Sequence, residues 1–267
     1  MLLAEPSRTP YDFQFQVFGF PVRVNPFFWV VALVVGWGLT ESFSRAPVDD
    51  NPGKAVLLIL WVAAMFVSIL IHELGHAFAF RYYGVHASIV LYHFGGLAIP
   101  DNHSSGFGTI SRFRRRQDQL VISAAGPAAQ LLLAAIVIGV VELSGYRLIS
   151  EIPLLDRLVV DSNKPLPASF VLWSIAYFLA APSVYWALLN LLPVYPLDGG
   201  QISRELFVRS GSRNAIRDSL TLSLITAGAC AIYSYSTGDP FIMMLFISLA
   251  ISSYQLLQAS RMGGGMW

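Results

Sequence analysis

Charged residues and cysteine are both scarce in this sequence. Only 12% of its 267 residues are Asp, Glu, Lys or Arg, while 55% are hydrophobic. A soluble domain of this length carries roughly twice that charged fraction, so the composition indicates an integral membrane protein. The net charge of +1 gives no reason to expect nucleic acid or an acidic partner. The single cysteine, Cys230, excludes an internal disulfide and a zinc site built on cysteines.

The N-terminal segment lacks the pattern of a removable signal peptide. Arg8 and a polar, aromatic stretch come before the first apolar run, and no short apolar segment there leads to a cleavage site. Internal repeats are also missing. The longest loop, approximately residues 81–118, is too short to fold a sizeable core of its own. We therefore expect neither a cleaved leader nor an appended soluble domain.

Long apolar runs predict six transmembrane helices. They cover approximately residues 26–40, 54–80, 119–141, 168–192, 216–235 and 240–258. Of the 17 Lys and Arg residues, 12 fall on the side of the membrane that holds both termini and 5 on the other side. The positive-inside rule makes the first side cytoplasmic. We therefore expect a multi-pass protein of the cell (inner) membrane with both termini in the cytoplasm.

Two segments between the apolar runs have the character of β-strands. Residues 13–24 alternate with a period of two and break at Gly19 and Pro21, which predicts a short strand or hairpin before the first helix. Residues 88–99 are rich in residues that favour strands, with Gly95-Gly96 in the middle. Both segments fall on the expected cytoplasmic side.

The second predicted helix carries the sequence His72-Glu73-Leu74-Gly75-His76. Two histidines four residues apart lie on one face of a helix, so both imidazoles can bind one metal ion. Glu73 follows His72 and is close enough to reach a water molecule at that ion. This is the arrangement of a zinc hydrolase. Three ionisable groups inside a membrane span are costly unless the function requires them.

A catalytic zinc site needs a third protein ligand, and Asp198 is the candidate. It follows the fourth predicted helix in the sequence Asn190-Leu191-Leu192-Pro193-Val194-Tyr195-Pro196-Leu197-Asp198-Gly199-Gly200. The prolines end the helix, and the glycines let backbone segments come close. In the expected orientation His72 and His76 lie one to two turns before the cytoplasmic end of their helix. The three groups can therefore meet within the bilayer near the cytoplasmic face.

These residues together resemble the site-2 protease family of intramembrane metalloproteases. The segment 72–76 matches the His-Glu-x-x-His motif of the family, and the segment 190–199 matches its Asn-x-x-Pro-x-x-Pro-x-Asp-Gly motif. Gly126-Pro127 matches the Gly-Pro motif of the intervening helix. Gln130 departs from the family, which usually has Asn at this position, and the longer arm puts a polar contact there in question.

The resemblance implies a site and its residues. One Zn²⁺ per chain would be held by His72, His76 and Asp198, and Glu73 would be the general base. Asn190 would help to position the substrate or the transition state. The strand that contains Phe94, Gly95, Gly96 and Leu97 would pair with an unwound substrate segment.

The resemblance also implies a fold. We expect an all-α polytopic membrane protein with about six transmembrane helices, a three-helix catalytic core and small membrane-associated β-strands. Residues 1–53 would form an N-terminal β-hairpin and the first helix, and residues 54–200 the catalytic core with a cytoplasmic loop and an edge strand. Residues 201–267 would form a C-terminal pair of helices. No PDZ domain interrupts the sequence and no CBS pair follows it, so we expect a compact member of the family.

The implied activity is zinc-dependent cleavage of transmembrane segments in membrane-anchored regulatory proteins. The expected partners are the lipid bilayer and a single-span transmembrane substrate that another protease has already trimmed. One alternative is a non-catalytic zinc-binding transporter or scaffold, although the first, fifth and sixth predicted helices have no acidic residue or His in their apolar centres. Another is a membrane zincin of the type that processes prenylated proteins. Such enzymes resemble His-Glu-x-x-His proteins whose third ligand is a Glu on a later helix, and the motif around Asp198 argues against this alternative.

Overall fold

The computed structural model describes residues 7–92, 95–100, 116–158 and 164–262. Six helices in this part of the chain are long and apolar enough to cross a membrane. They are α1 (Pro26–Ser44), α2 (Lys54–Tyr82), α4 (Arg116–Leu143), α5 (Phe170–Asn190), α7 (Ala215–Thr237) and α8 (Pro240–Met262). The six spans predicted from the apolar runs are therefore confirmed as helices, each within a few residues of its expected ends.

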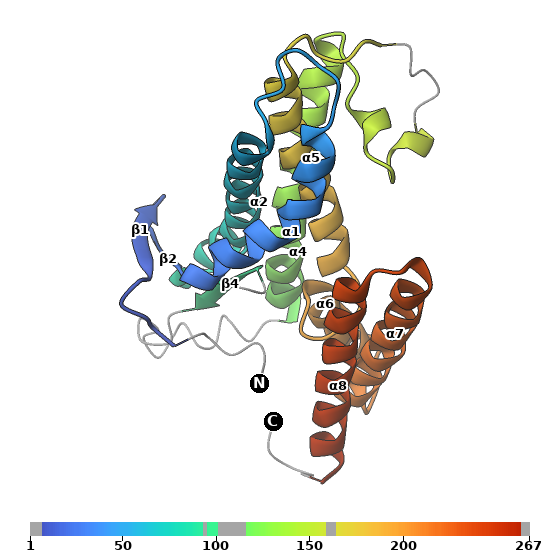
Figure 1. The fold of residues 1–267 in the computed structure, drawn as a ribbon. Helices are drawn as coiled ribbons and strands as arrows, with labels where there is room; N and C mark the ends of the chain where they lie inside the picture. Colours follow the sequence, from blue (N-terminus) through green and yellow to red (C-terminus); the bar gives the residue numbers. More distant parts are fainter. Residues whose placement is uncertain (1–6, 93–94, 101–115, 159–163, 263–267) are drawn as a thin grey trace.

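The centre of the structure is a bundle in which α2 packs against α1, α4 and α5. The apolar sequence of α2 buries Leu57, Trp61 and Ile69 in this bundle. Trp61 fits against α1 because residue 36 is glycine, where a Cβ would lie 2.1 Å from the indole ring. Figure 1 shows α7 and α8 side by side, away from this bundle. They connect to it through the short helix α6 (Asp198–Arg209), which contacts both α4 and α7.

Helices α2 and α4 come into backbone contact at Gly75. A Cβ at this position would lie 2.4 Å from the carbonyl oxygen of Ala125 and 2.9 Å from the Cβ of Ala129. Contacts below 3.0 Å are not tolerated, so a side chain at residue 75 would force the two helices apart. The sequence of α2 is otherwise free of glycine and proline, and it continues as one helix until Tyr82.

Four strands form a mixed sheet in the order β1-β2-β3-β4. Strands β1 (Phe13–Val17) and β2 (Phe20–Val24) form the hairpin predicted for residues 13–24, with Phe18 and Gly19 at positive φ in the turn. Strand β2 pairs in parallel with β3 (Ala87–Tyr92), and β3 pairs antiparallel with β4 (Gly95–Pro100).

The prediction of a single β-rich segment at residues 88–99 was too coarse. The segment forms two strands, β3 and β4, and residues 93–94 between them lie outside the described part of the chain. Gly95 has φ +115° and begins β4. The glycine pair thus marks the start of a second strand, because the positive φ that Gly95 adopts is unfavourable for other residues. As a result β4 is an edge strand among the described residues.

The sheet is attached to the end of α2 that follows the histidines. Strands β3 and β4 both contact α2, and in Figure 1 the sheet lies beside the lower half of this helix. The Arg81 side chain donates from Nη2 to the carbonyl oxygen of Phe18 at 2.8 Å and lies 3.6 Å above the ring of Phe20. The β1–β2 turn and the last turn of α2 are therefore held together by a hydrogen bond and a cation–π contact.

The backbone contact at Gly75 predicts unequal effects for the same chemical change at two glycines. Gly75→Ala should lower the free energy of unfolding in detergent by about 1–3 kcal/mol, because α2 and α4 must separate. Gly139→Ala adds the same methyl group to α4 where nothing lies within 4 Å of it, so its higher helix propensity should leave stability unchanged or raised by up to about 1 kcal/mol. Thermal unfolding of both variants checks the prediction, and equal melting temperatures would contradict it.

Candidate metal centre

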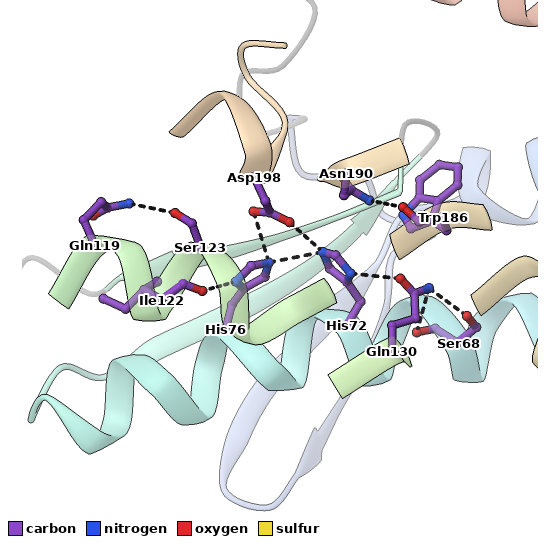
Figure 2. Close-up of polar contacts among 10 residues, drawn as sticks. All are labelled: Ser68, His72, His76, Gln119, Ile122, Ser123, Gln130, Trp186, Asn190 and Asp198. Carbon is purple, nitrogen blue, oxygen red and sulfur yellow. Dashed lines mark hydrogen bonds and ion pairs between the residues drawn. The ribbon is translucent and has the colours of Figure 1, made fainter. Parts of the chain in front are cut away.

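Three buried side chains converge between α2 and α6. His72 and His76 lie one turn apart on the same face of α2, and Asp198 is the first residue of α6. The two imidazole Nε2 atoms are 3.1 Å apart. Asp198 Oδ2 lies 3.1 Å from His72 Nε2, and Oδ1 lies 3.4 Å from His76 Nε2. Figure 2 shows the three side chains pointing toward a common centre.

The spacing of these atoms suits a tetrahedral zinc ion. Ligand atoms about 2.0–2.1 Å from a tetrahedral centre lie about 3.3 Å from one another. The separations between the three groups are 3.1 Å, 3.1 Å and 3.4 Å. In the described part of the chain this is the group of His, Cys, Asp and Glu residues whose ligand atoms lie close enough to hold a metal, all within 4.8 Å of one another. Two imidazoles and one carboxylate also form the set of ligands that leaves one zinc position open.

The orientation of His76 is fixed by the backbone of α4. Its Nδ1 lies 2.7 Å from the carbonyl oxygen of Ile122. A carbonyl oxygen only accepts hydrogen bonds, so Nδ1 of His76 carries a proton, and when the ring is neutral its Nε2 presents a lone pair to Asp198. The carboxylate is also an acceptor. Neighbouring acceptors repel one another unless a cation lies between them. These two imidazoles and the carboxylate therefore fit a metal ion.

Gly126 leaves the space that His76 occupies. A Cβ at residue 126 would lie 2.2 Å from His76 Nε2. Glycine at this position of the Gly126-Pro127 motif therefore has a steric reason in this chain, because any side chain would displace the imidazole.

Glu73 lies beside the cluster, against the edge strand. Glu73 is 4% exposed, and a Cβ at Gly96 would lie 2.4 Å from Glu73 Oε1. The backbone amide of Ala98, in the same strand, also lies near the Glu73 carboxylate. One residue along a helix rotates a side chain by about 100°, so Glu73 faces β4 while the two histidines face Asp198. The carboxylate is thus close to the candidate ligands without being one of them.

A tight turn between α5 and α6 brings Asp198 to the histidines. Helix α5 ends at Asn190, and the chain turns through Leu191–Leu197 before α6 begins. A Cβ at Gly199 would lie 2.1 Å from the carbonyl oxygen of Leu191, so the turn closes only with glycine there. Ser223 on α7 accepts from the backbone N–H of Tyr195 at 3.0 Å and holds the turn from the other side.

The sequence did not predict helix α6 or the involvement of Trp186. Asp198 was expected in irregular backbone, but it begins a helix of 12 residues. Gln201 of this helix accepts at Oε1 a hydrogen bond from Gln119 Nε2 of α4 at 2.8 Å, next to the site. The backbone carbonyl oxygen of Trp186 accepts a hydrogen bond from Asn190 Nδ2 at 3.0 Å. The Trp186 ring lies so close to Gly95 that a Cβ there would be 2.8 Å away. No motif marks a tryptophan one turn before Asn190.

The remaining predicted residues have different outcomes. Asn190 is half-buried at the end of α5, and Figure 2 shows its side chain directed to the carbonyl oxygen of Trp186. Leu97 lies in β4, opposite Val90 of β3. Phe94 lies outside the described residues. Gln130 does make the polar contact that its longer arm had put in question, because its Oε1 is 3.0 Å from His72 Nδ1.

Comparisons with known proteins identify the family. The sequence profile of peptidase family M50 matches residues 60–232, more than half of the chain. A zinc metalloprotease of Methanocaldococcus jannaschii is 26% identical over 198 residues, which are 72% of this chain and 44% of that protein. A Synechocystis protein assigned to the zinc metalloproteases is 26% identical over 191 residues, or 71% of this chain and 42% of that one. The chain thus spans less than half of the length of these two relatives.

A shorter relative and a solved structure extend the match. Rip2 of Mycolicibacterium smegmatis, also assigned to the zinc metalloproteases, is 26% identical over 201 residues, which are 67% of this chain and 69% of Rip2. The structure of the site-2 protease from Methanocaldococcus jannaschii superimposes with a TM-score of 0.53 over 92% of this chain and 95% of that chain. At 20% identity this likeness concerns the fold. The profile match and the family's fold lead to one conclusion: the chain belongs to peptidase family M50, the site-2 protease family of membrane zinc metalloproteases.

Proposed function

We propose that this protein is an intramembrane endopeptidase that cleaves transmembrane segments of membrane-anchored regulatory proteins. One zinc ion per chain is held by His72, His76 and Asp198. The observation that carries the proposal is the convergence of three buried ligand atoms at tetrahedral spacing, next to a buried glutamate and an edge strand. A metal site without catalytic function would have no use for a buried carboxylate such as Glu73 at this place.

Glu73 has the position of a general base and acid. Zinc bound at the three ligands would supply a Lewis acid that acidifies a water molecule and polarises the peptide carbonyl. Glu73 takes the proton of the attacking water and later delivers it to the leaving amide nitrogen. Its carboxylate is held between α2 and β4, so it acts from a fixed position.

Strand β4 is the docking site that we propose for the substrate. A transmembrane helix hides its carbonyl groups in its own hydrogen bonds, so the segment to be cut must first unwind. Pairing with an edge strand satisfies the backbone groups that unwinding exposes. Among the described strands β4 is such an edge, and its Gly96 and Ala98 lie against Glu73. Asn190, at the end of α5, would help to bind the substrate.

The orientation in the membrane follows from the basic residues. With both termini in the cytoplasm, the sheet and the end of α2 near Arg81 lie at the cytoplasmic face. The site then lies within the bilayer roughly 8–14 Å from that face at 1.5 Å per residue, where water from the cytoplasm is nearest. We infer from the resemblance to the site-2 protease family that the substrate is a single-span protein already trimmed by another protease.

Glu73→Gln should abolish peptide cleavage and leave zinc binding intact. Loss of the proton acceptor should lower the rate by at least about 100-fold, whereas the three ligands remain in place. Zinc content by mass spectrometry and cleavage of a membrane-anchored substrate in liposomes measure the two effects. Glu151 is a half-buried glutamate in the short turn that follows the C-terminal end of α4, far along the chain from the histidine contacts at the start of that helix. Glu151→Gln is the control and should keep full activity. Full activity of Glu73→Gln would overturn the proposed mechanism.

Gly96→Ala should impair cleavage without loss of zinc. The added methyl group would lie 2.3 Å from Glu73 Cγ, so the carboxylate or the strand must move. A displacement of 1 Å in a catalytic group can cost about 100-fold in rate. The same assays apply, with Gly38→Ala as control, since a Cβ there has nothing within 4 Å. Cleavage at the wild-type rate by Gly96→Ala would show that Glu73 does not need its position against β4.

A further inference from the structure

Gln130 is completely buried in α4 and connects the metal centre to α5. Its Oε1 lies 3.0 Å from His72 Nδ1, and its Nε2 lies 2.8 Å from Ser68 Oγ on α2. Ser68 Oγ is 2.8 Å from Ser183 Oγ on α5, and Ser183 Oγ donates to the carbonyl oxygen of Leu179 at 2.5 Å. Figure 2 shows Gln130 between His72 and Ser68. Gln130, Ser68 and Ser183 are each at most 1% exposed.

The direction of every hydrogen bond in this chain is determined from its far end. The carbonyl oxygen of Leu179 can only accept, so the single hydroxyl proton of Ser183 points to it. Ser68 must then supply the proton between the two hydroxyl groups. With its proton used, Ser68 Oγ accepts from the amide Nε2 of Gln130, which is a donor only. The amide is therefore oriented with Oε1 toward the imidazole.

The last bond of the chain fixes the tautomer of His72. Gln130 Oε1 accepts, so His72 Nδ1 carries the proton and Nε2 keeps its lone pair for the metal. His76 reaches the same tautomer through the carbonyl oxygen of Ile122. Both rings therefore present Nε2 to the centre. The partner that orients a metal-binding histidine typically changes metal affinity by about 10–100-fold.

We propose that Gln130 is a positioning residue of the zinc site, and that Ser68 and Ser183 orient its amide. The proposal rests on the proposed function, since it assumes zinc at His72, His76 and Asp198. It gives α5 an effect on the metal through two hydroxyl groups, although α5 supplies no ligand. If these hydrogen bonds only packed the helices together, breaking them would change the stability of the fold and leave zinc affinity unaltered.

Substitutions at residue 130 test the acceptor. Gln130→Leu removes it at nearly the same volume and should weaken zinc binding about 10–100-fold. Gln130→Glu keeps an oxygen acceptor for His72 Nδ1 and should bind zinc at least as tightly as the wild type. Zinc affinity of the purified protein is measured by competition with a chromophoric chelator, and thermal unfolding of the zinc-free protein reports the fold. Wild-type affinity in Gln130→Leu, or a loss in Gln130→Glu equal to that in Gln130→Leu, would overturn the proposal.

Substitutions on α5 test the hydrogen bonds that continue from Gln130 through Ser68 to Ser183. Ser183→Ala should weaken zinc binding several-fold, and it should add nothing in the Gln130→Leu background because the chain is already broken there. Ser174→Ala is the matched control. Ser174 is also buried on α5 and donates to a backbone carbonyl one turn earlier, that of Phe170 at 2.7 Å, but it has no link to His72. Equal zinc affinities of Ser183→Ala and Ser174→Ala would overturn the proposed role of Ser183. Additive losses in the variant that combines Ser183→Ala with Gln130→Leu would overturn it as well.

Asp198→Ala separates failure of this inference from failure of the proposed function. Removal of a ligand should lower zinc affinity more than any change at residue 130. If the wild type binds no zinc, or if Asp198→Ala binds it as tightly as the wild type, the metal site is wrong and both proposals fail. If Asp198→Ala loses zinc while Gln130→Leu retains it, the metal site stands and the positioning role of Gln130 is overturned.

Discussion

The backbone contact between α2 and α4 at Gly75 determines the geometry of the metal centre. A Cβ at Gly75 would lie 2.4 Å from the Ala125 carbonyl oxygen, so the two backbones meet here with no side chain between them. At this short separation His76 reaches the Ile122 carbonyl at 2.7 Å, and its ring fills the space where Gly126 has no side chain. The ligands on α2 are thus aimed by rigid helices, which hold a site more accurately than loops do.

Water is scarce inside a membrane protein, so buried polar groups need partners within the protein. The two histidines meet this requirement in different ways. His76 uses a backbone carbonyl of α4, an acceptor that no substitution removes. His72 uses the side chain of Gln130. Gln130 is also the position at which the sequence departs from the family motif, and its longer arm spans from His72 to Ser68. The hydrogen-bond partner of His72 is therefore open to variation in sequence, and that of His76 is not.

Much of the fold and the site could be predicted because their signals are local. Apolar runs gave six helices, and the spacing of His72 and His76 placed both on one face. Asp198 was predictable only through its motif, since its approach depends on the closed turn at Gly199. Helix α6 was missed because its polar sequence, which begins Asp-Gly-Gly, is typical of a loop. The helix is stabilised by its packing against α4 and α7, which the sequence does not reveal. The position of Trp186 against Gly95 depends on how α5 and β4 lie in space, which local sequence does not encode. The domain division and the membrane orientation stay predictions.

The rotation of an α-helix also separates metal binding from proton transfer. His72 and His76 face Asp198, and Glu73 is turned about 100° from His72 toward Gly96 and the Ala98 amide of β4. In the proposed function, the base therefore lies against the strand on which the substrate is held. A substrate strand that pairs with β4 would therefore bring its backbone past Glu73. The absence of a side chain at Gly96 is what lets the strand and the base lie this close.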